Sequence, residues 1–335
     1  MGRKAIFLGP QAVDLVLEPV AAAVQLNGID VLRFYSEDDL GARYDALADA
    51  SVLYAPGAAR ISRTLLEAAP NLRAVISIYT GTDGFDEAAA TALGVVVGNG
   101  QVPENYESMA EATILLILSC LYDPKGAQTQ LAPNAPAISR RAVHMLRGKT
   151  LGIVGFGQIA RATAARLEPW GVNFLISTPR PRPPFPIGAR VVAVDELLKE
   201  SDIICVLAPL NAETSGLLNA ERLARTKRGS IFINVSRGGI VDEHALYALA
   251  AQKHFSAIAL DVFETEPLPK DSALRSLDNA ILTPHTIGHT EETVASLISC
   301  GSESIMRVFR GELPLYVRNP DVASAWLKRW SAATS

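Results

Sequence analysis

The stretch TLGIVGFGQIA, residues 150–160, constrains the fold of this chain more than any other. Leu151, Ile153 and Val154 suit a buried parallel strand, and GFGQIA after them fits the pattern G-x-G-x-x-G/A. In that pattern the first glycine makes a tight turn, the second lets backbone approach a pyrophosphate, and the next helix points its N-terminal N–H groups at the phosphate. A plain strand-to-helix turn is the alternative, but the flanking strand and helix favour dinucleotide binding.

Length and charge narrow the class of protein. A chain of 335 residues is long enough for two domains. Its net charge of −4, without a basic block, argues against nucleic acid or an anionic membrane as partner. No apolar run reaches membrane-spanning length and the N-terminus has no signal-peptide pattern, so we expect a cytoplasmic protein. Cys120, Cys205 and Cys300 lie far apart in apolar runs, which indicates buried thiols rather than a disulfide, and no metal site is expected.

The first hundred residues alternate short β-rich runs with helical stretches. The runs KAIFLG, DVLRFY, ASVLYA, AVISIY and VVV read as strands, with helices near 19–26 and 62–69. This predicts a small doubly wound α/β domain. A loop with two glycines, residues 79–84, follows AVISIY at the carboxyl end of a strand, where open sheets place ligands. A simple turn is an equally good interpretation of that loop.

The same alternation continues after residue 150. A helix is predicted over 104–121, and the segment 123–148, with three prolines, is predicted to be a loop or extended arm lying on the surface or across a dimer partner. Strands then follow at 172–177, ARVVAV, DIICVLAP, SIFINVS and SAIALDV, separated by helices that include DEHALYALAAQ. Such alternation predicts a parallel sheet with helices on both faces, a Rossmann-type domain.

Three chemically useful residues follow strands of this second domain. Arg237 comes after SIFINVS, Glu266 just past SAIALDV, and His285 after AILTP. Taken singly, they could be a surface ion-pair arginine, a solvated carboxylate and a structural imidazole. Because the carboxyl ends of strands form the ligand crevice, the set is more informative than its members. Arginine, glutamate and histidine are the groups that a keto-acid reductase needs.

Four segments, GIVGFGQIA, NVSRGGIVDEHAL, ALDVFETEPLP and TPHTIGHT, resemble in order the signatures of the D-isomer-specific 2-hydroxyacid dehydrogenase family. The resemblance runs from ISIYTGTDGFD through NGQVPENYESMAEAT to the final helix. It implies an α/β fold of two doubly wound parallel-sheet domains. A Rossmann-type NAD(P)-binding domain, 102–286, is inserted into a smaller flavodoxin-like substrate domain, 1–101 with 287–335, and the active-site cleft lies between them.

The resemblance also implies roles for single residues. Arg237 would bind the substrate carboxylate and carbonyl, as a forked guanidinium can. His285 would be the general acid that protonates the ketone oxygen, and Glu266 would hydrogen-bond its other ring nitrogen and fix the tautomer. The facing domain would contact the substrate through Tyr79, Thr80 and Gly81, with the N–H groups of the last two on the carboxylate.

All of the implied cofactor contacts except Gly288 lie in the second domain. Those at the pyrophosphate are Gly155, Gly157, Gln158 and Ile159. Those around the adenosine and nicotinamide are Thr178, Arg180, Pro209, Thr214, Val235, Ser236, Asp261 and Gly288.

The end of the second Rossmann strand bears on cofactor choice. NAD-specific domains carry an Asp or Glu roughly 20 residues beyond the glycine turn, where it binds the adenosine ribose. Here VNFLIS is followed by TPRPRPP, so no carboxylate stands there and Arg180 and Arg182 are available for a 2′-phosphate. This favours NADP(H), with NAD(H) possible. The alternative is that both arginines are solvated loop charges and the enzyme accepts either cofactor.

Some residues depart from the family pattern. Ile78, Tyr79 and Thr80 are bulkier than the small residues common there, which leaves the size of the substrate open. Glu266 in place of glutamine argues against formate dehydrogenase. The chain ends at Ser335, so we expect no C-terminal regulatory domain of the long phosphoglycerate dehydrogenases. His289 either touches the substrate or is a rim histidine without function.

The sequence therefore predicts an NAD(P)H-dependent enzyme that interconverts a small 2-keto acid and a D-2-hydroxy acid, similar to glyoxylate/hydroxypyruvate reductases. We expect it to form a homodimer through the cofactor domain. A short phosphoglycerate dehydrogenase is the nearest alternative, but it needs a cationic phosphate site that the loop 79–86 does not supply. A dinucleotide-sensing binding protein without turnover is the other, and the complete set of Arg237, Glu266 and His285 counts against it.

Overall fold

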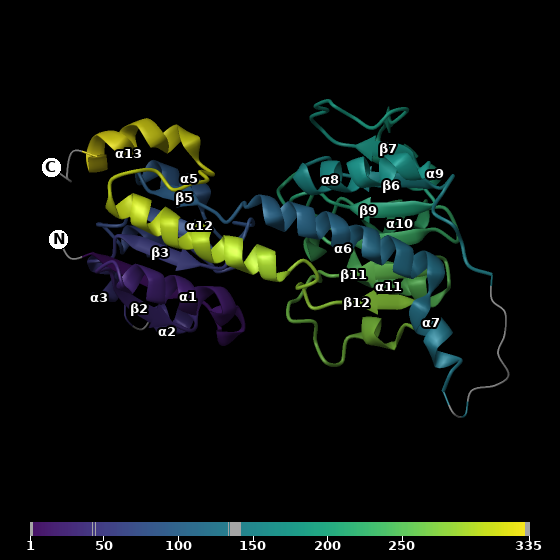
Figure 1. Ribbon diagram of the computed structural model, residues 1–335, viewed down its shortest axis with the longest axis horizontal. Coiled ribbons are helices and arrows are strands. Elements are labelled where there is room, and N and C mark those ends of the chain that lie inside the picture. The colour runs from purple at the N-terminus through teal and green to yellow at the C-terminus, as the bar shows by residue number, and fades with distance from the viewer. Residues whose placement is uncertain (1–2, 42, 44, 133, 135–141, 332–335) are drawn as a thin grey trace. The chain divides into compact units, whose positions relative to one another are not determined.

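The computed structural model describes residues 3–41, 43, 45–132, 134 and 142–331. The chain forms two compact units (Figure 1). Unit 1 comprises residues 1–105 together with 290–335, and unit 2 comprises residues 106–289. That unit 1 binds the substrate and unit 2 the cofactor is a prediction from the sequence.

Unit 1 is built on five parallel strands in the order β2-β1-β3-β4-β5, the flavodoxin-like order. β3 and β4 are buried along their whole length, as strands covered by helices on both faces must be. The predicted strands are confirmed. They are β1 (Lys4–Leu8), β2 (Asp30–Phe34), β3 (Val52–Ala55), β4 (Ala74–Ser77) and β5 (Val96–Gly98).

Helices cover both faces of this sheet. On one face α1 and α12 lie side by side (Figure 1) and bury residues such as Leu17 and Ile305. The first helix begins at Asp14, five residues before the predicted Pro19, because Val16, Leu17 and Val20 already follow helical spacing into the core. The helical elements are η1 (Gln11–Val13), α1 (Asp14–Gln25), α2 (Glu37–Gly41), α3 (Asp45–Ala48), α4 (Arg63–Glu67), α5 (Glu87–Ala92), α12 (Glu291–Phe309), η5 (Pro320–Val322) and α13 (Ala323–Trp330).

Unit 2 is built on seven parallel strands in the order β12-β11-β10-β9-β6-β7-β8. The order reverses between β6 and β9, and open α/β sheets bind ligands outside the carboxyl ends at such a point. The strands are β6 (Thr150–Val154), β7 (Asn173–Ser177), β8 (Arg190–Val191), β9 (Ile203–Val206), β10 (Ile231–Asn234), β11 (Ala257–Leu260) and β12 (Ala280–Leu282).

The helices of unit 2 also cover two faces. α6 and α8 bury Ile117 and Ala164 against one face, and α9, α10 and α11 bury Leu197, Leu223 and Leu246 against the other. The helical elements are α6 (Pro103–Tyr122), α7 (Pro124–Thr129), α8 (Gln158–Leu167), η2 (Glu168–Trp170), α9 (Val194–Glu200), α10 (Ala220–Ala224), η3 (Gly238–Ile240), α11 (Glu243–Ala251) and η4 (Ala273–Ser276).

Two local predictions were wrong. The segment 123–148 begins as the helix α7 rather than as loop, because Asp123 accepts a hydrogen bond from the Gly126 N–H at 2.9 Å and Pro124 stands at the first helical position. Residues 133 and 135–141 of that segment lie outside the described residues. The predicted strand ARVVAV pairs over Arg190–Val191 alone, since it is an exposed edge strand with little apolar surface to bury.

Two further predictions from the sequence concern the burial of the cysteine thiols and the absence of a membrane-spanning run. Cys205 and Cys300 are buried, whereas Cys120 is half-buried, and burial raises the pKa of the Cys120 thiol to about 12. Among the described residues, no helix is both long enough and apolar enough to cross a membrane.

Candidate active site

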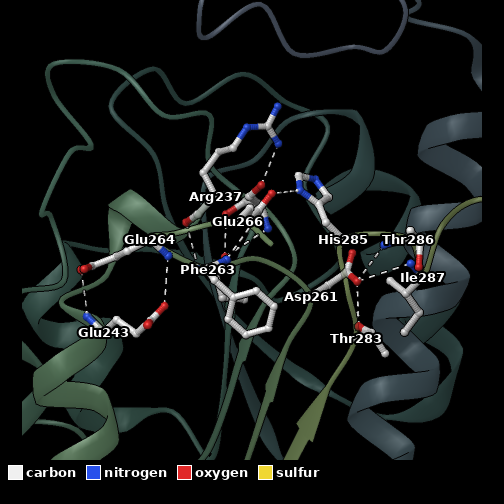
Figure 2. Close-up of polar contacts among 12 residues, drawn as sticks. Arg237, Glu243, Asp261, Phe263, Glu264, Glu266, Thr283, His285, Thr286 and Ile287 are labelled. Carbon is white, nitrogen blue, oxygen red and sulfur yellow. Dashed lines mark hydrogen bonds and ion pairs between the residues drawn. The ribbon is translucent and has the colours of Figure 1, made fainter. Parts of the chain in front are cut away.

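Three adjacent strand ends of unit 2 bring the predicted catalytic residues together. β10, β11 and β12 are parallel neighbours, so their carboxyl ends meet at one edge of the sheet. Arg237 follows β10, Glu266 stands on the loop after β11, and His285 follows β12. Figure 2 shows the three side chains converging above these strands.

His285 and Glu266 form a direct pair. The ring Nδ1 lies 2.7 Å from Oε2 of Glu266. The other carboxylate oxygen, Oε1, accepts the N–H of Phe263 at 3.1 Å, so backbone fixes the carboxylate while the carboxylate orients the ring. A carboxylate on Nδ1 places the hydrogen there and leaves Nε2 as the nitrogen able to exchange a proton with a ligand.

The charge state of Glu266 follows from its neighbours. Desolvation pushes the pKa of the Glu266 carboxyl upward, but the hydrogen bond from His285, the charge of that histidine, the Phe263 N–H and the charge of Arg237 together bring its pKa below the ordinary value. The carboxylate is therefore ionised at neutral pH and can stabilise a protonated imidazole.

His285 has a left-handed backbone, with φ of 57°. That conformation is uncommon outside glycine and costs on the order of 1–3 kcal/mol. Asp261, 1% exposed at the end of β11, supports it. Its Oδ1 accepts the Thr283 hydroxyl at 2.7 Å and the N–H groups of Thr286 and Ile287 at 3.2 and 3.4 Å, on both sides of the histidine (Figure 2).

Asp261 was predicted at the cofactor, and whether it contacts a cofactor stays a prediction. Its carboxylate is a support for the histidine loop. Burial raises the pKa of the Asp261 carboxyl, against the hydrogen bond from Thr283 and the charge of His285, which lower it.

Arg237 stands on a turn that side chains hold in shape. Asn234, the last residue of β10, accepts the N–H and the hydroxyl of Ser236 at 3.1 and 2.9 Å and donates its amide to the Arg237 carbonyl at 2.9 Å. The guanidinium Nη1 of Arg237 donates to the Ser236 carbonyl at 2.7 Å. Ser236, predicted at the cofactor, thus also shapes the turn that presents Arg237.

Three residues that were not predicted from the sequence, Gly238, Glu243 and Glu264, join the Arg237 turn to the Glu266 loop. A Cβ at Gly238 would overlap the carbonyl of Phe263, so only glycine allows this backbone contact. Glu243 and Glu264 then exchange hydrogen bonds, each carboxylate accepting the other's N–H at 3.1 and 3.0 Å (Figure 2). The glycine directly after Arg237 was the available signal.

In the glycine turn after β6, the first glycine packs closely against a neighbouring loop and the second faces open space. Gly155 has φ of +88°, and its Cβ would lie 2.6 Å from the Cα of Ala208 in the loop after β9. Gly157 is the N-cap of α8, with no side-chain cap and no heavy atom within 4 Å of an added Cβ. Gln158 and Ile159 begin the helix. The open, uncapped helix end at the switch point fits an anionic group.

The remaining predicted cofactor residues lie after strands of unit 2 and differ in exposure. Thr214 donates its hydroxyl to the Pro209 carbonyl at 2.6 Å and so shapes the loop after β9, whereas Pro209 is itself exposed. Gly288 is buried against Met109, and its carbonyl accepts the Ser108 hydroxyl at 2.8 Å. Val235 is buried directly after β10. Their contacts with a cofactor stay predictions.

The strand end that bears on cofactor choice is β7. Ser177 ends the strand, Thr178 after it is half-buried, and Arg180 and Arg182 are exposed on the proline-rich loop that follows. Neither arginine pairs with an acidic residue in the part of the chain that the structure describes. Both side chains are therefore available to an anion.

The predicted substrate loop, Tyr79–Gly81, lies in unit 1 after β4. Its carbonyls are bound: Gly100 N–H donates to Tyr79 at 2.9 Å, the Asn99 amide to Thr80 at 2.7 Å, and the Ser77 hydroxyl to Gly81 at 2.6 Å. No described acceptor takes the N–H of Thr80 or Gly81. A loop fixed through its carbonyls can offer those two N–H groups to a carboxylate.

His289 lies in the loop after His285. Its N–H donates to the Thr286 carbonyl at 2.9 Å. Burial and the charge of His285 lower the pKa of the His289 ring, while the charge of Asp261 raises it. The charges of His285 and Asp261 therefore act on this exposed residue, and its contact with substrate stays a prediction.

The family model described as "D-isomer specific 2-hydroxyacid dehydrogenase, NAD binding domain" matches residues 115–286, all within unit 2. The chain belongs to this family. Unit 2 therefore contains a nicotinamide dinucleotide-binding domain.

Similar proteins agree with the assignment. The chain is 34% identical to D-3-phosphoglycerate dehydrogenase of Methanocaldococcus jannaschii over 88% of its own length and 56% of that protein, so it spans about half the length of such relatives. It is 34% identical to glyoxylate/hydroxypyruvate reductase B of Escherichia fergusonii, over 79% of this chain and 83% of that one. The structure of an NADPH-dependent glyoxylate/hydroxypyruvate reductase from Sinorhizobium meliloti, in complex with NADP and malonate, matches with a TM-score of 0.83 and 26% identity, over 96% and 98% of the two chains.

Proposed function

We propose that the protein reduces a small 2-keto acid to a D-2-hydroxy acid with a reduced nicotinamide cofactor. The observation that carries the proposal is the His285–Glu266 pair, 2.7 Å apart, beside Arg237 at adjacent strand ends of an NAD-binding domain. A proton donor and a forked cation are the two groups that a keto acid needs for reduction. In this proposal unit 2 is the cofactor domain and unit 1 the substrate domain.

Each proposed catalytic residue has one task. Arg237 binds the substrate carboxylate through its fork, and the N–H groups of Thr80 and Gly81 also donate to that carboxylate. His285 gives the proton on Nε2 to the ketone oxygen, and Glu266 stabilises the imidazolium before the transfer. The cofactor supplies the hydride that reduces C2. The imidazole then recovers its proton from solvent, and Tyr79 limits the size of the acid.

A panel of 2-keto acids tests this proposal. The purified protein is mixed with NADPH or NADH and with glyoxylate, hydroxypyruvate, pyruvate or 3-phosphohydroxypyruvate, and loss of the reduced-nicotinamide absorbance is followed. We expect turnover of one or more of the unphosphorylated acids. Turnover confined to 3-phosphohydroxypyruvate would make the protein a short phosphoglycerate dehydrogenase. Cofactor binding without turnover of any acid would make it a dinucleotide-sensing protein.

The finer proposal on the cofactor is a preference for NADP(H). No carboxylate follows β7, and Arg180 and Arg182 are exposed beside Thr178. Hydrogen bonds to charged groups contribute about 1.5–3 kcal/mol, so one phosphate contact favours NADPH by about 10- to 150-fold. Measuring kcat/KM for both cofactors, in wild type and in Arg180→Ala, tests this. A preference for NADH in the wild type would contradict it.

We also propose a homodimer formed through unit 2. Leu115, Tyr122, Met145 and Trp170 are exposed there, and a groove of about 410 Å³ lies among Leu118, Tyr122, Met145 and Trp170. Clustered exposed apolar side chains favour protein association. Light scattering should give twice the chain mass of 35.7 kDa, and Trp170→Glu should shift the protein to monomer. A wild-type monomer at micromolar concentration would rule the dimer out.

A further inference from the structure

Arg161, in the first turn of α8, holds the loop that follows β7. Its Nη1 donates to the Pro184 carbonyl at 2.8 Å, and its Nη2 donates to the Arg182 carbonyl. We propose that Arg161 is a positioning residue that fixes this loop, residues 179–187, and thereby sets discrimination between NADPH and NADH. The inference rests on the proposed NADP(H) preference and assigns its origin to a residue that need not touch the phosphate.

The composition of the loop explains why it needs an external donor. Proline occupies positions 179, 181, 183, 184 and 186, and proline has no N–H to give. The loop can therefore make few backbone hydrogen bonds of its own. Its carbonyls remain as acceptors, and a guanidinium with several donors in one plane can bind two of them at once. Arg161 does so at Arg182 and Pro184.

Aromatic packing also supports the hydrogen bonds between Arg161 and the loop. The guanidinium carbon of Arg161 lies 4.7 Å from the ring centroid of Phe156, the residue between the two glycines of the turn. The Phe156 ring in turn lies 5.2 Å from the ring of Phe185 on the loop. Cation–π and aromatic contacts of this kind favour one relative position. The loop is thus packed directly on the glycine turn.

A second attachment lies at the far end of the loop. The Ile187 N–H donates to Oε1 of Glu168 at 2.6 Å, and Glu168 begins η2 directly after α8. Arg161 and Glu168 therefore fasten the loop at two points along one helical segment. The loop position is tied to α8 and not only to β7.

This attachment relates two parts of the proposed cofactor site. Gly157 is the N-cap of α8, where the pyrophosphate would lie, and Arg161 follows that glycine by four residues. By donating a hydrogen bond to the Arg182 carbonyl, Arg161 fixes the distance from the N-terminus of α8 to the backbone that carries Arg180 and Arg182. Because both terminal nitrogens of its guanidinium donate to loop carbonyls, Arg161 acts on the 2′-phosphate through the loop.

The test uses ligands that carry only the adenosine end of the cofactor. Adenosine 2′,5′-bisphosphate and AMP are titrated by calorimetry into wild type and Arg161→Met. We expect the variant to bind the bisphosphate about 10-fold more weakly and AMP within 2-fold of wild type. The KM for NADPH should rise about 10-fold while kcat at saturating NADPH and the KM for NADH stay within 2-fold.

Two further variants provide a control and an independent test of the loop attachment. Arg166→Met is the matched control, because Arg166 lies on the same helix but pairs with Glu107 of α6 and should leave the bisphosphate affinity unchanged. Glu168→Ala removes the second attachment and should act in the same direction as Arg161→Met, by a smaller factor. It also keeps the proposal testable if Arg161→Met does not fold.

The outcomes separate this inference from the cofactor proposal. If Arg180→Ala combined with Arg182→Ala leaves bisphosphate affinity unchanged, the loop does not read the phosphate and the NADP(H) proposal fails. If that double variant weakens it but Arg161→Met and Glu168→Ala do not, the positioning role of Arg161 is overturned and the cofactor proposal stands. Equal losses for AMP and the bisphosphate in Arg161→Met would also overturn that role.

Discussion

Two ends of the unit 2 sheet support their side chains in different ways. At β10 to β12 the supports are internal: Asn234 and Asp261 are 2% and 1% exposed, and backbone contacts backbone at Gly238. At β6 to β8 the supported loop is exposed and rich in proline, and the attachments come from Arg161 and Glu168 on its surface. The supports at β10 to β12 are therefore buried in the core, whereas the loop after β7 is held by hydrogen bonds at the surface.

This difference matches the geometric precision that each end of the sheet needs for its proposed task. Proton transfer requires a donor within hydrogen-bond reach and correctly aligned, and a displacement of about 1 Å can cost on the order of 10²-fold in rate. Buried polar support provides that precision. Binding an anion through charged side chains tolerates looser geometry, so an exposed loop suffices. Changes at the first end should therefore affect kcat, and changes at the second should affect KM.

The largest effect is expected from removing the proton donor. His285→Ala should lower kcat by about 10² to 10⁴-fold, the usual contribution of general acid catalysis, while the cofactor dissociation constant stays within about 3-fold. Steady-state reduction of glyoxylate or hydroxypyruvate and fluorescence titration of NADPH measure the two quantities. The control is His144→Ala, which changes an exposed histidine outside the site. A His285→Ala enzyme within a few-fold of wild type would remove His285 from the mechanism.

Arg237→Lys should be the next largest change. An ammonium keeps the charge but loses the planar fork, so at least one charge-assisted hydrogen bond of about 1.5–3 kcal/mol is lost. We expect kcat/KM for the keto acid to fall by about 10- to 150-fold. Arg228→Lys, at an exposed position, is the matched control. An unchanged kcat/KM would place Arg237 outside the substrate site.

Asp261→Ala tests the internal support itself. It leaves the Thr283 hydroxyl and the N–H groups of Thr286 and Ile287 without their acceptor, so the free energy of unfolding should fall by about 2–3 kcal/mol. Because the histidine loop is then less well held, kcat should fall by about 10-fold. Urea unfolding and steady-state kinetics measure both. Asp278→Ala, an exposed carboxylate paired with Lys253, should change neither; equal effects of the two would contradict the proposed support.

The smallest effect concerns the pH dependence of stability. The folded-state pKa of Glu266 lies below its ordinary value of 4.5, so its charge stabilises the fold above pH 4.5 and that stabilisation is lost as pH falls through the folded-state pKa. The pair is partly exposed, which limits the effect to about 1 kcal/mol or less. Glu266→Gln should thus be less stable than wild type at pH 7, with a smaller gap at pH 4. A gap that widens on acidification would contradict this sign.

The sequence by itself determined the two parallel sheets and the strand ends. Alternating β-rich and helical runs predict parallel strands, and the polar residues that follow them, Arg237 and His285, must then lie at one edge. The glycine turn at Gly155 is likewise a local pattern. These features could be predicted because they depend on residues a few positions apart. Glu266 was named with them, and the catalytic roles of all three remain proposals.

Tertiary structure alone decided what holds those side chains in place. Asp261 supports a loop more than 20 residues later in the chain, the Gly238 contact reaches Phe263, and Arg161 binds a carbonyl 23 residues away at Pro184. Each contact depends on the distance between strand ends that are adjacent in the sheet but separated in sequence. No local pattern encodes that distance, because it is fixed only when the strands pair and the helices pack against them.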